Sequence, residues 1–429
     1  MDELKFKTAV KFRYSLSSGH CYSNMEISEK TIKFIQDHAK EDINSLRLKY
    51  SGNPDKMDIP IDFALLQIEA RRKAQKKIPT YLENVLFFFP DSISAEQASN
   101  EAVARLHASL VESGSTLLDL TAGLGIDDME FAKAGIYVTA CEINEAKAEA
   151  LRHNSIIMGL TDRINVINTD SIEYLRQCGE RFDVVFSDPA RRSTTGKRLH
   201  ALSDCQPDIL GAMDTIMKTA NRLIVKASPM LDISLIRETV EHLSHIYITC
   251  LKGECKEVLI DIRRGTEFTG TTVIDLDMTG TGSTFDCLYS PTKPPINYAE
   301  RNSPEDYRYL YEPNAGVMKT GAWGELCSRF DGLEKADRNT HLFLSDRLFI
   351  DFPGRVTAVD SMLDKKGLKE LKGGKCNTVA RNYPLSAPEL AKKHSLIPGG
   401  DRFLYAFRYK GKPICVLTVP VRNEKQSTE

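Results

Sequence analysis

The sequence predicts an α/β protein whose core is a parallel β-sheet, with a helical region before the sheet and smaller α+β segments after it. Between residues 114 and 264, short runs rich in β-branched residues alternate with helical segments, which is typical of right-handed βαβ units covered on both faces. A glycine-rich turn follows the first run, and acidic residues follow the next ones. Hydrophobic residues make up 41% of the 429 residues and charged residues 27%, the balance of an ordinary globular protein.

The chain before the sheet is expected to be helical. Residues 1–24 lack clear periodicity, so we expect a disordered leader there and a native start near Met25. Within the helical region, 25–113, apolar residues recur at three- and four-residue spacing over 29–50 and indicate one amphipathic helix. A second helix is expected over 61–77.

Local signals bound these helices. Pro79 should end the second helix, because the residue before a proline avoids the helical region. A third helix is expected from Ser94, since Ser94 and Gln97 form an S-x-x-Q capping box, and Gly114 suits the position after its end.

The sheet-forming segment is expected over 114–290. A hairpin over 245–250 and 258–262 should close the sheet with an antiparallel strand, and 265–295 should be a linker with an edge strand at 273–276. The parallel strands are expected at 116–120, 136–141, 164–168, 182–187 and 222–226, with helices at 127–134 and 145–158 between them.

The turn after the first strand is the most informative segment. In Asp119-Leu-Thr-Ala-Gly-Leu-Gly-Ile-Asp127, the glycines Gly123 and Gly125 would let the backbone approach a ligand closely. Position 128 is Asp, so the third glycine of a dinucleotide-binding turn is missing. An acidic turn suits a ligand with a cationic centre better than it suits a pyrophosphate. Thr121 and Ala122 lie between the two ends of this turn.

Further acids follow the next strands. Glu142, followed by Ile143, ends the second strand, where a carboxylate can accept both hydroxyls of a ribose. Asp170, followed by Ser171, ends the third and could hold an amino group of adenine. All these sites lie at the carboxyl ends of parallel strands, where open α/β sheets bind ligands. Simpler explanations stay open, because Asp119 could cap a turn and Asp170 a helix.

The fourth strand ends in Asp188-Pro189-Ala190-Arg191. The order of glycine turn, ribose acid, third acid and D-P-x-x resembles the class I S-adenosylmethionine-dependent methyltransferases, with their Rossmann-like sheet. The resemblance covers 114–264 and implies S-adenosylmethionine as the cofactor. It implies contacts to the cofactor from Asp119, Thr121, Ala122, Gly123, Gly125, Asp127, Glu142, Ile143, Asp170, Ser171 and Asp188.

The resemblance also assigns a catalytic role to Asp188 and Pro189. Methyltransferases of exocyclic amines carry a D/N-P-P-aromatic motif, in which the carboxylate and the proline carbonyl hold the two amine hydrogens. Ala190 and Arg191 depart from that motif, so no aromatic ring is available to stack on a base. Arg191 and, beyond it, Arg192 and Arg198 could instead bind phosphate, although a polar loop after a strand is also a sufficient explanation. Lys226, at the end of the fifth strand, could line the pocket or be a solvated strand end.

The C-terminal part is basic. Residues 351–429 contain 15 Lys and Arg against 8 Asp and Glu, a balance of +7, whereas the whole chain has a formal charge of −2. Such a module beside an acidic remainder suits a polyanion, although a solvated basic surface would look the same. The lysines and arginines of 71–77 form a second basic run, for which a solvated helix face or RNA contact is open.

Several strings after residue 308 resemble a bacterial family of class I methyltransferases that has a ferredoxin-like and a THUMP-like domain. They include Tyr309-Leu-Tyr-Glu-Pro-Asn314, Phe352-Pro-Gly-Arg355 and Arg381-Asn-Tyr-Pro-Leu385. The resemblance implies a ferredoxin-like domain over 291–354, a THUMP-like domain over 355–429 and an RNA partner, and related sequences include the RNA cap guanine-N2 methyltransferases. Candidate RNA-binding residues in this part are Arg381, Lys392, Lys393 and Arg402.

These observations predict an S-adenosylmethionine-dependent methyltransferase that acts on a base of tRNA or rRNA. The missing aromatic residue leaves open an RNA-binding protein with little or no methyl transfer, and a methyltransferase for a small metabolite is a further alternative. The ten cysteines contain no C-x-x-C, so no metal site is expected. The longest apolar run is far shorter than the roughly 18–20 residues that span a bilayer, and the N-terminus has no apolar signal segment, so we expect a cytoplasmic protein without a membrane partner. The sequence does not predict an oligomeric state.

Overall fold

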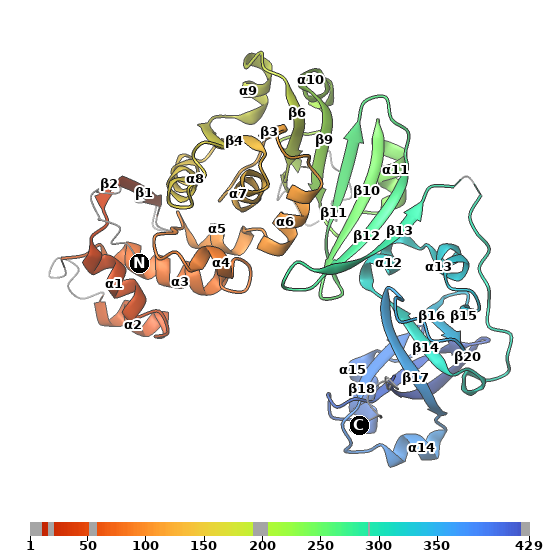
Figure 1. Cartoon of the computed structure of the whole chain (residues 1–429). Helices are drawn as coiled ribbons and strands as arrows, with labels where there is room; N and C mark the ends of the chain where they lie inside the picture. The colour runs from red at the N-terminus through yellow and green to blue at the C-terminus, as the bar shows by residue number, and fades with distance from the viewer. Residues whose placement is uncertain (1–10, 16–20, 51–57, 192–204, 291, 422–429) are drawn as a thin grey trace, which may run out of the picture. The chain divides into compact units, whose positions relative to one another are not determined.

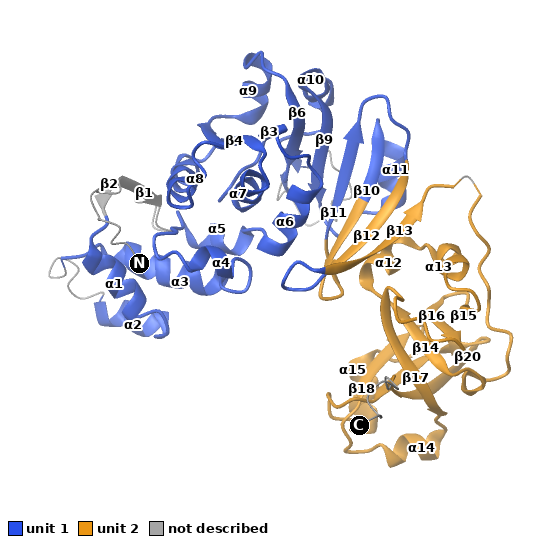
Figure 2. Cartoon of the chain, viewed as in Figure 1, with its two compact units in different colours: residues 1–246, 257–268, 276–281 blue, residues 247–256, 269–275, 282–429 orange. Residues whose placement is uncertain are grey.

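A computed structural model of the chain describes residues 11–15, 21–50, 58–191, 205–290 and 292–421 (Figure 1). The predicted α/β fold class is confirmed, because a mixed sheet with a parallel core is flanked by helices and a second sheet follows it. The chain divides into two compact units (Figure 2). Unit 1 comprises residues 1–246, 257–268 and 276–281, and unit 2 comprises 247–256, 269–275 and 282–429.

The N-terminal part differs from the expectation in its details. Two strands, β1 (Lys11–Ser15) and β2 (Cys21–Glu26), pair antiparallel where a disordered leader was expected, and the rest of that leader lies outside the described residues. The helix expected over 29–50 is two helices, α1 (Glu29–Asp37) and α2 (Ile43–Tyr50). Four more helices follow: α3 (Ile61–Ala74), α4 (Pro79–Leu82), α5 (Ser92–Gln97) and α6 (Glu101–Ser109).

The capping box expected at Ser94 is wrong. Asp91 caps α5 instead, and its Oδ1 accepts a hydrogen bond of 2.6 Å from the backbone N–H of Ser94. The chain leaves the helical region at Ala98, and the side chain of Asn100 caps α6 by accepting from Ala102. A second N-cap residue three positions after α5 thus splits the expected helix. Gly114 lies beyond α6 and donates its N–H to Gly135 instead of terminating that helix.

The large sheet has nine strands in the order β13-β12-β10-β11-β9-β6-β3-β4-β5. Its parallel half pairs β5 with β4, β4 with β3, β3 with β6 and β6 with β9, and β11 then pairs antiparallel with β9, as the predicted closing hairpin requires. The chain order reverses between β3 and β6, and such a switch point opens a crevice at the carboxyl ends of the strands. The parallel strands and β11 are β3 (Thr116–Asp119), β4 (Tyr137–Glu142), β5 (Ile164–Asn168), β6 (Phe182–Ser187), β9 (Ala220–Ala227) and β11 (Glu254–Arg263).

The linker expected over 265–295 contains two strands of the sheet. After β10 (Leu243–Leu251) and β11, the chain forms β12 (Gly270–Leu276) and β13 (Gly282–Leu288), and β13 is the edge strand. Short β7 (Ala190–Arg191) and β8 (Cys205–Gln206) pair outside the sheet. The helices of this part are α7 (Ile126–Lys133), α8 (Glu145–Ile157), α9 (Ser171–Gln177), α10 (Met213–Thr219) and α11 (Ile233–Thr239).

Helices α7 and α8 lie between the sheet and the N-terminal helices (Figure 1). On α8, the amide of Asn154 accepts from the backbone N–H of Phe88 and donates to its carbonyl, at 3.0 and 2.9 Å. On α3, Gln67 makes the same pair of bonds with Phe89. These two buried amides pair with the backbone of 87–89, whose side chains are fully buried, so the N-terminal helices and the sheet share one core.

Unit 2 contains a seven-stranded sheet in the order β15-β16-β14-β17-β20-β19-β18. Its strands are β14 (Tyr309–Pro313), β15 (Glu334–Asp337), β16 (Thr340–Ser345), β17 (Gly354–Met362), β18 (Asn377–Arg381), β19 (Phe403–Tyr409) and β20 (Lys412–Pro420). Helices α12 (Ala315–Thr320), α13 (Trp323–Arg329), α14 (Lys365–Glu370) and α15 (Ala387–His394), with the short 3₁₀ turn Pro304–Asp306, complete it.

Both faces of this sheet are covered. Along β19, Tyr405 and Phe407 enter a core with Leu310, whereas Leu404 and Ala406 enter a second core on the other face. This alternation is the two-residue period of a strand that is buried on both sides. Strand β14 pairs with β17, so the segments expected as ferredoxin-like and THUMP-like share one sheet.

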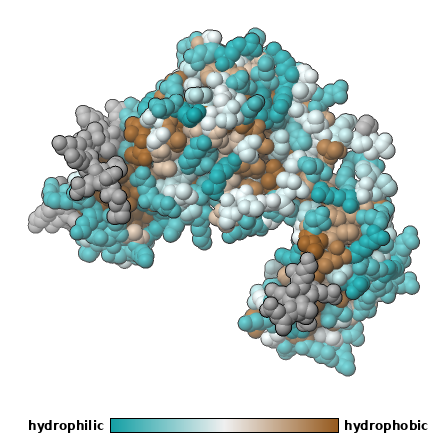
Figure 3. All heavy atoms as spheres, in the orientation of Figure 1, coloured by the Kyte–Doolittle hydropathy of each residue, from teal (hydrophilic) through white to brown (hydrophobic). Residues whose placement is uncertain are grey.

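Within the described part of the chain, no helix combines the length and the apolar character needed to cross a membrane. On the face of the molecule in Figure 3, hydrophobic residues form separate patches among hydrophilic ones.

Candidate functional site

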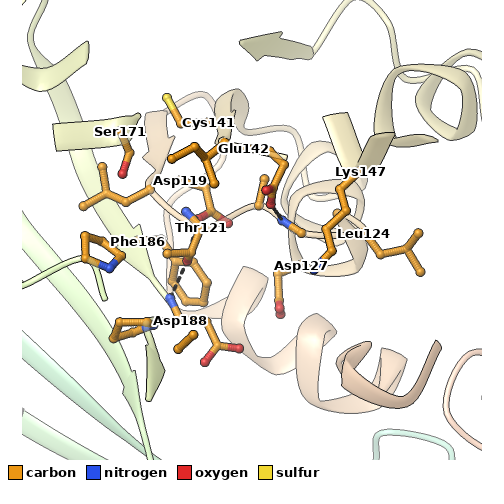
Figure 4. Close-up of a pocket in the computed structure, with 18 of the residues that line it drawn as sticks. Asp119, Thr121, Leu124, Asp127, Cys141, Glu142, Lys147, Ser171, Phe186 and Asp188 are labelled. Carbon is orange, nitrogen blue, oxygen red and sulfur yellow. Dashed lines mark hydrogen bonds between the residues drawn. The ribbon is translucent and has the colours of Figure 1, made fainter. Parts of the chain in front are cut away.

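A cavity of about 690 Å³ lies in unit 1 at the carboxyl ends of β3, β4 and β6 (Figure 4). Every residue expected to bind the cofactor or the acceptor amine lines it, namely Asp119, Thr121, Ala122, Gly123, Gly125, Asp127, Glu142, Ile143, Asp170, Ser171, Asp188 and Pro189. Further lining residues include Gln97, Ser99, Leu124, Lys147, Phe186, Gln206, Pro207 and Asp208. Gln97, which the sequence assigned to a capping box, therefore lines the cavity.

Hydrogen bonds tie the turn after β3 to the end of β6. Asp119 Oδ1 accepts from the backbone N–H and the hydroxyl of Thr121, at 2.6 and 3.2 Å. The same hydroxyl oxygen accepts the backbone N–H of Asp188 at 2.7 Å (Figure 4). Asp119 does cap the turn, as the simpler explanation has it, and through Thr121 it also sets the start of the Asp188-Pro189 segment.

The two glycines of the turn are needed for different reasons. Gly123 is needed for its backbone conformation, a φ of +59°. Space is not the reason, because a β-carbon there would meet no atom nearer than the Thr121 carbonyl oxygen, at 3.8 Å. Gly125 has a φ of +79°, and a β-carbon there would lie 2.0 Å from a methyl group of Leu151 on α8. Gly125 thus allows α7 to pack closely against α8, in addition to turning the backbone.

Glu142 holds the turn from the next strand. Its Oε2 accepts the N–H of Gly123 at 2.9 Å, and its Oε1 accepts the N–H of Asn144 at 2.7 Å. The residue as a whole is 9% exposed and lines the cavity. Each oxygen has a second lone pair, so Glu142 can also accept hydroxyl groups of a ligand.

Asp170 is the N-cap residue of α9, as the simpler explanation expects. Its Oδ1 accepts from the backbone N–H groups of Ile172 and Glu173, at 2.9 and 3.0 Å. The residue also lines the cavity, so capping and ligand contact do not exclude each other.

Beneath the turn lies a pair of buried acids, Asp119 and Asp128. Asp128 is fully buried on α7, and none of the described residues donates a hydrogen bond to either of its carboxyl oxygens. Burial and the adjacent charge of Asp119 raise its pKa well above the usual range, and burial raises the pKa of Asp119 to about 7. Both shifts favour proton retention by this buried pair.

A second cluster of charges adjoins Asp188. The ammonium of Lys226, at the end of β9, is 2.8 Å from Asp188 Oδ2 and donates to the hydroxyl of Ser99 at 2.8 Å. Lys226 is therefore no solvated strand end, because its side chain is 13% exposed. Burial would lower its pKa, but Asp127, Asp188 and Glu257 raise it overall.

His107 on α6 bridges the other two acids of this cluster. Its Nδ1 is 2.7 Å from Asp127 Oδ1, and its Nε2 hydrogen-bonds Glu257 Oε1. Burial would lower the pKa of His107, but Glu257 and Asp127 together raise it to about 9. Both ring nitrogens therefore donate, and the ring is an imidazolium at neutral pH. Burial acts to raise the pKa of Asp127, yet Lys226 and His107 lower it far below its usual value.

The segment after Pro189 forms one side of the cavity mouth. Pro189 is buried, Ala190 is exposed, and β7 pairs with β8, which brings Gln206 to the rim. The predicted phosphate-binding residues Arg192 and Arg198 lie outside the described residues, as does the side chain of Arg191.

The candidate RNA-binding residues of the C-terminal part lie in unit 2. Arg381 donates to Glu312 at 2.6 Å, and this buried carboxylate also accepts from Arg355 and Tyr405 at 3.1 Å each. Arg381 thus has a structural partner, although its side chain is 43% exposed. Lys392 and Lys393, in the last turn of α15, and Arg402, before β19, are exposed.

The basic run on α3 serves the fold. Arg71 donates to the carbonyls of Leu82 and Phe87, at 2.6 and 2.9 Å, and Arg72 donates to the carbonyl of Ala39. Lys73 pairs with Glu69 and Glu96. These contacts account for three cations of the run as helix-packing residues. In the described part of the chain, no group of three or more His, Cys, Asp or Glu side chains could hold a metal ion.

Comparison with known proteins defines the class. A family model described as RNA cap guanine-N2 methyltransferase matches residues 114–193, one described as ferredoxin-like domain matches 309–353, and one described as THUMP domain-like matches 354–420. The chain therefore contains a class I methyltransferase domain, a ferredoxin-like domain and a THUMP-like domain, and the resemblance noted in the sequence is confirmed.

Two individual proteins are similar to the chain. Ribosomal RNA small subunit methyltransferase J of Acinetobacter baylyi is 23% identical over 188 residues, which are 40% of this chain and 66% of that protein, just under two thirds of its length. The crystal structure of a candidate methyltransferase from Porphyromonas gingivalis W83 is 24% identical, has a TM-score of 0.79, and covers 93% of this chain and 100% of its own. The second protein shares the fold over nearly the whole chain.

Proposed function

We propose that the chain is an S-adenosylmethionine-dependent methyltransferase that methylates a base of tRNA or rRNA in the cytoplasm. One observation carries this proposal: the glycine turn, Glu142 and the Asp188-Pro189 pair line one cavity at the carboxyl ends of parallel strands. The THUMP-like and methyltransferase domains and the rRNA methyltransferase relative support an RNA acceptor.

The residues around the cavity fit S-adenosylmethionine. Its volume of about 690 Å³ is typical of small-molecule sites. Glu142 lies beside the turn, where its carboxylate can accept two ribose hydroxyls, and the acids Asp119 and Asp127 suit a cationic ligand. When bound, the cofactor supplies a methyl group whose carbon takes the lone pair of the acceptor while the carbon–sulfur electron pair leaves with sulfur.

Asp188 and Pro189 would hold the acceptor. The side chain of Asp188 is 44% exposed, so its carboxylate can accept one N–H of a base amine while the Pro189 carbonyl accepts the other. Holding both hydrogens orients the nitrogen lone pair, and positioning of this kind supplies most of the rate gain expected here. Methylation leaves one extra proton on the nitrogen, which passes to water at this exposed carboxylate.

The site restricts which nucleotides can react. A base stacked inside a helix cannot enter a cavity of this kind, so the acceptor has to be single-stranded or splayed out of its stack. We propose that exposed Lys392, Lys393 and Arg402 bind RNA phosphates, and that Arg191, Arg192, Arg198 and Arg381 contribute further contacts.

Labelling tests the proposal. The purified full-length chain is incubated with methyl-labelled S-adenosylmethionine and total RNA from cells that lack this protein, and the RNA is digested to nucleosides. We expect label in one methylated nucleoside. Label in small molecules with RNA unlabelled would instead identify a metabolite methyltransferase. RNA binding without any labelled product would identify a binding protein.

A further inference from the structure

Lys226 lies among polar partners from four parts of the fold. Besides Asp188 after β6 and Ser99 between α5 and α6, each 2.8 Å away, its Nζ is 3.7 Å from Asp127 Oδ2 on α7 and 3.8 Å from Glu257 Oε2 on β11. With a side chain 13% exposed, the ammonium is solvated by these groups and hardly by water.

Asp188 differs from the other carboxylates of this cluster in exposure. Its side chain is 44% exposed and lines the cavity, whereas those of Asp127 and Glu257 are 12% and 6% exposed. The ion pair engages Oδ2 of Asp188, so it fixes the orientation of an otherwise solvated side chain and leaves Oδ1 outside the pair. A carboxylate held in this way can present one oxygen in a constant direction.

Two cations balance three carboxylates in the cluster. The imidazolium of His107 bonds Asp127 and Glu257, and Lys226 bonds Asp188. One negative charge remains, which matches the single positive charge of a sulfonium ligand in the same cavity. Ser99 joins the two parts of the cluster, because its hydroxyl donates to Asp127 at 2.5 Å and accepts from Lys226.

We infer that Lys226 is a positioning residue of the methyltransferase site that holds the acceptor-binding carboxylate of Asp188, while His107 holds the other carboxylates that surround Lys226. The inference rests on the proposed function and adds to it how the acceptor is oriented. Ala190 offers no aromatic ring on which a base could stack, so the hold on the acceptor depends on the carboxylate. A loosened carboxylate therefore lowers the rate.

A second ion pair on the same strand lies away from the cavity and provides a structural comparison. Arg222, four residues earlier on β9, pairs with Asp261 at 2.9 Å, and their side chains are 14% and 1% exposed. Asp261 is buried, Arg222 is largely covered, and neither lines the cavity. Arg222→Met is therefore a matched control for Lys226→Met, because each variant removes a mostly buried cation from β9.

A double-mutant cycle on the full-length chain tests the inference. Lys226→Met, Asp188→Asn and the double variant are compared with the wild type for kcat and KM with RNA and for the Kd of S-adenosylmethionine. We expect Lys226→Met to lower kcat on the order of 100-fold, the loss that a misplacement of about 1 Å can cause. In the Asp188→Asn background the same change should lower kcat less than about 3-fold, because the partner through which Lys226 acts is already altered.

Cofactor binding separates positioning from collapse of the site. Lys226→Met makes the cluster more negative, so the Kd of the cationic cofactor should stay within about 3-fold of the wild type. Lys226→Arg should recover part of the rate, and Arg222→Met should keep kcat. If Lys226→Met does not fold, Lys226→Gln takes its place in the cycle. Fully additive losses in the double variant would overturn the inference, whereas a wild type that labels no RNA would overturn the proposed function instead.

Discussion

Single residues define the chemistry of the cavity through their charge states. Asp119 and Asp128 have raised pKa values, whereas Asp127, despite its burial, has a lowered pKa beside Lys226 and His107, and Asp188 pairs with Lys226. Asp127 and Asp128, which are neighbours in the first turn of α7, thus have opposite pKa shifts. Divided roles of this kind are what a site needs when it binds a cation and also orients a neutral amine.

Asp188→Ala should separate chemistry from cofactor binding. We expect kcat for RNA methylation to fall at least about 100-fold, because the acceptor loses its positioning group. The Kd of S-adenosylmethionine should change less than about 3-fold. Asp183→Ala is the control, since Asp183 lies on the same strand at the amino end and bonds Thr116 there. An unchanged rate in Asp188→Ala would refute the catalytic role.

Asp128→Asn should change how stability depends on pH. The pKa values of Asp119 and Asp128 are raised in the folded state, so the fold keeps protons that the unfolded chain releases at a lower pH. The free energy of unfolding therefore falls as the pH rises from about 4 through about 7. An amide can donate to Asp119 without titrating. We therefore expect the free energy of unfolding of the variant to exceed that of the wild type by on the order of 1–2 kcal/mol at pH 8 and by little at pH 5, as measured by urea unfolding. The exposed acid replacement Asp214→Asn should show no such difference. Equal effects of Asp128→Asn at both pH values would contradict the raised pKa values of the buried pair.

At the scale of elements, the turn after β3 is held from three sides. Thr121 ties it to the end of β6, Glu142 on β4 accepts from Gly123, and Gly125 lets α7 approach Leu151 on α8. The shape of the cavity therefore depends on helix packing as well as on strand order.

Gly125→Ala should destabilise the protein more than an equal change elsewhere. Alanine at a φ of +79° is strained, and its β-carbon would lie 2.0 Å from Leu151. Gly159→Ala is the control, because its φ is +69° and nothing lies within 4 Å. In urea unfolding, we expect the control to lose about 1 kcal/mol of unfolding free energy, which is the backbone strain alone. Gly125→Ala should lose about 2–4 kcal/mol. Equal losses would mean that Leu151 can move aside freely.

Sequence patterns predicted the strands well and the helix ends poorly. The run at 182–187 matches β6, because a buried parallel strand is marked by its apolar residues. The helix expected from Ser94 is split, because Asn100 caps a second helix that periodicity alone does not reveal. The glycine turn and the acids after the strands were found because they follow predicted strands. His107 and Glu257, 150 residues apart, carry no local signal, since only folding brings them together.

At the scale of the whole molecule, unit 2 is one folded body and not two. Strand β14 pairs with β17, and Tyr405 and Phe407 of β19 share a core with Leu310. The ferredoxin-like and THUMP-like segments therefore depend on each other for their cores. A shared sheet gives the basic C-terminal surface a rigid support, which an RNA-binding surface needs in order to hold a substrate in one orientation.

The salt dependence of RNA binding tests that surface. Each phosphate contact contributes about 0.7 to the slope of log K against log salt for single strands. Replacing Lys392, Lys393 and Arg402 by alanine should therefore lower the slope by about 2 and weaken binding to different RNA sequences alike. Lys365, Lys366 and Lys369 of α14 are also exposed and provide a control of equal charge on the same unit. Equal slope changes in both triple variants would mean that RNA binding depends on the net charge of the unit and not on these three residues. Only a defined contact surface distinguishes one group of exposed cations from another.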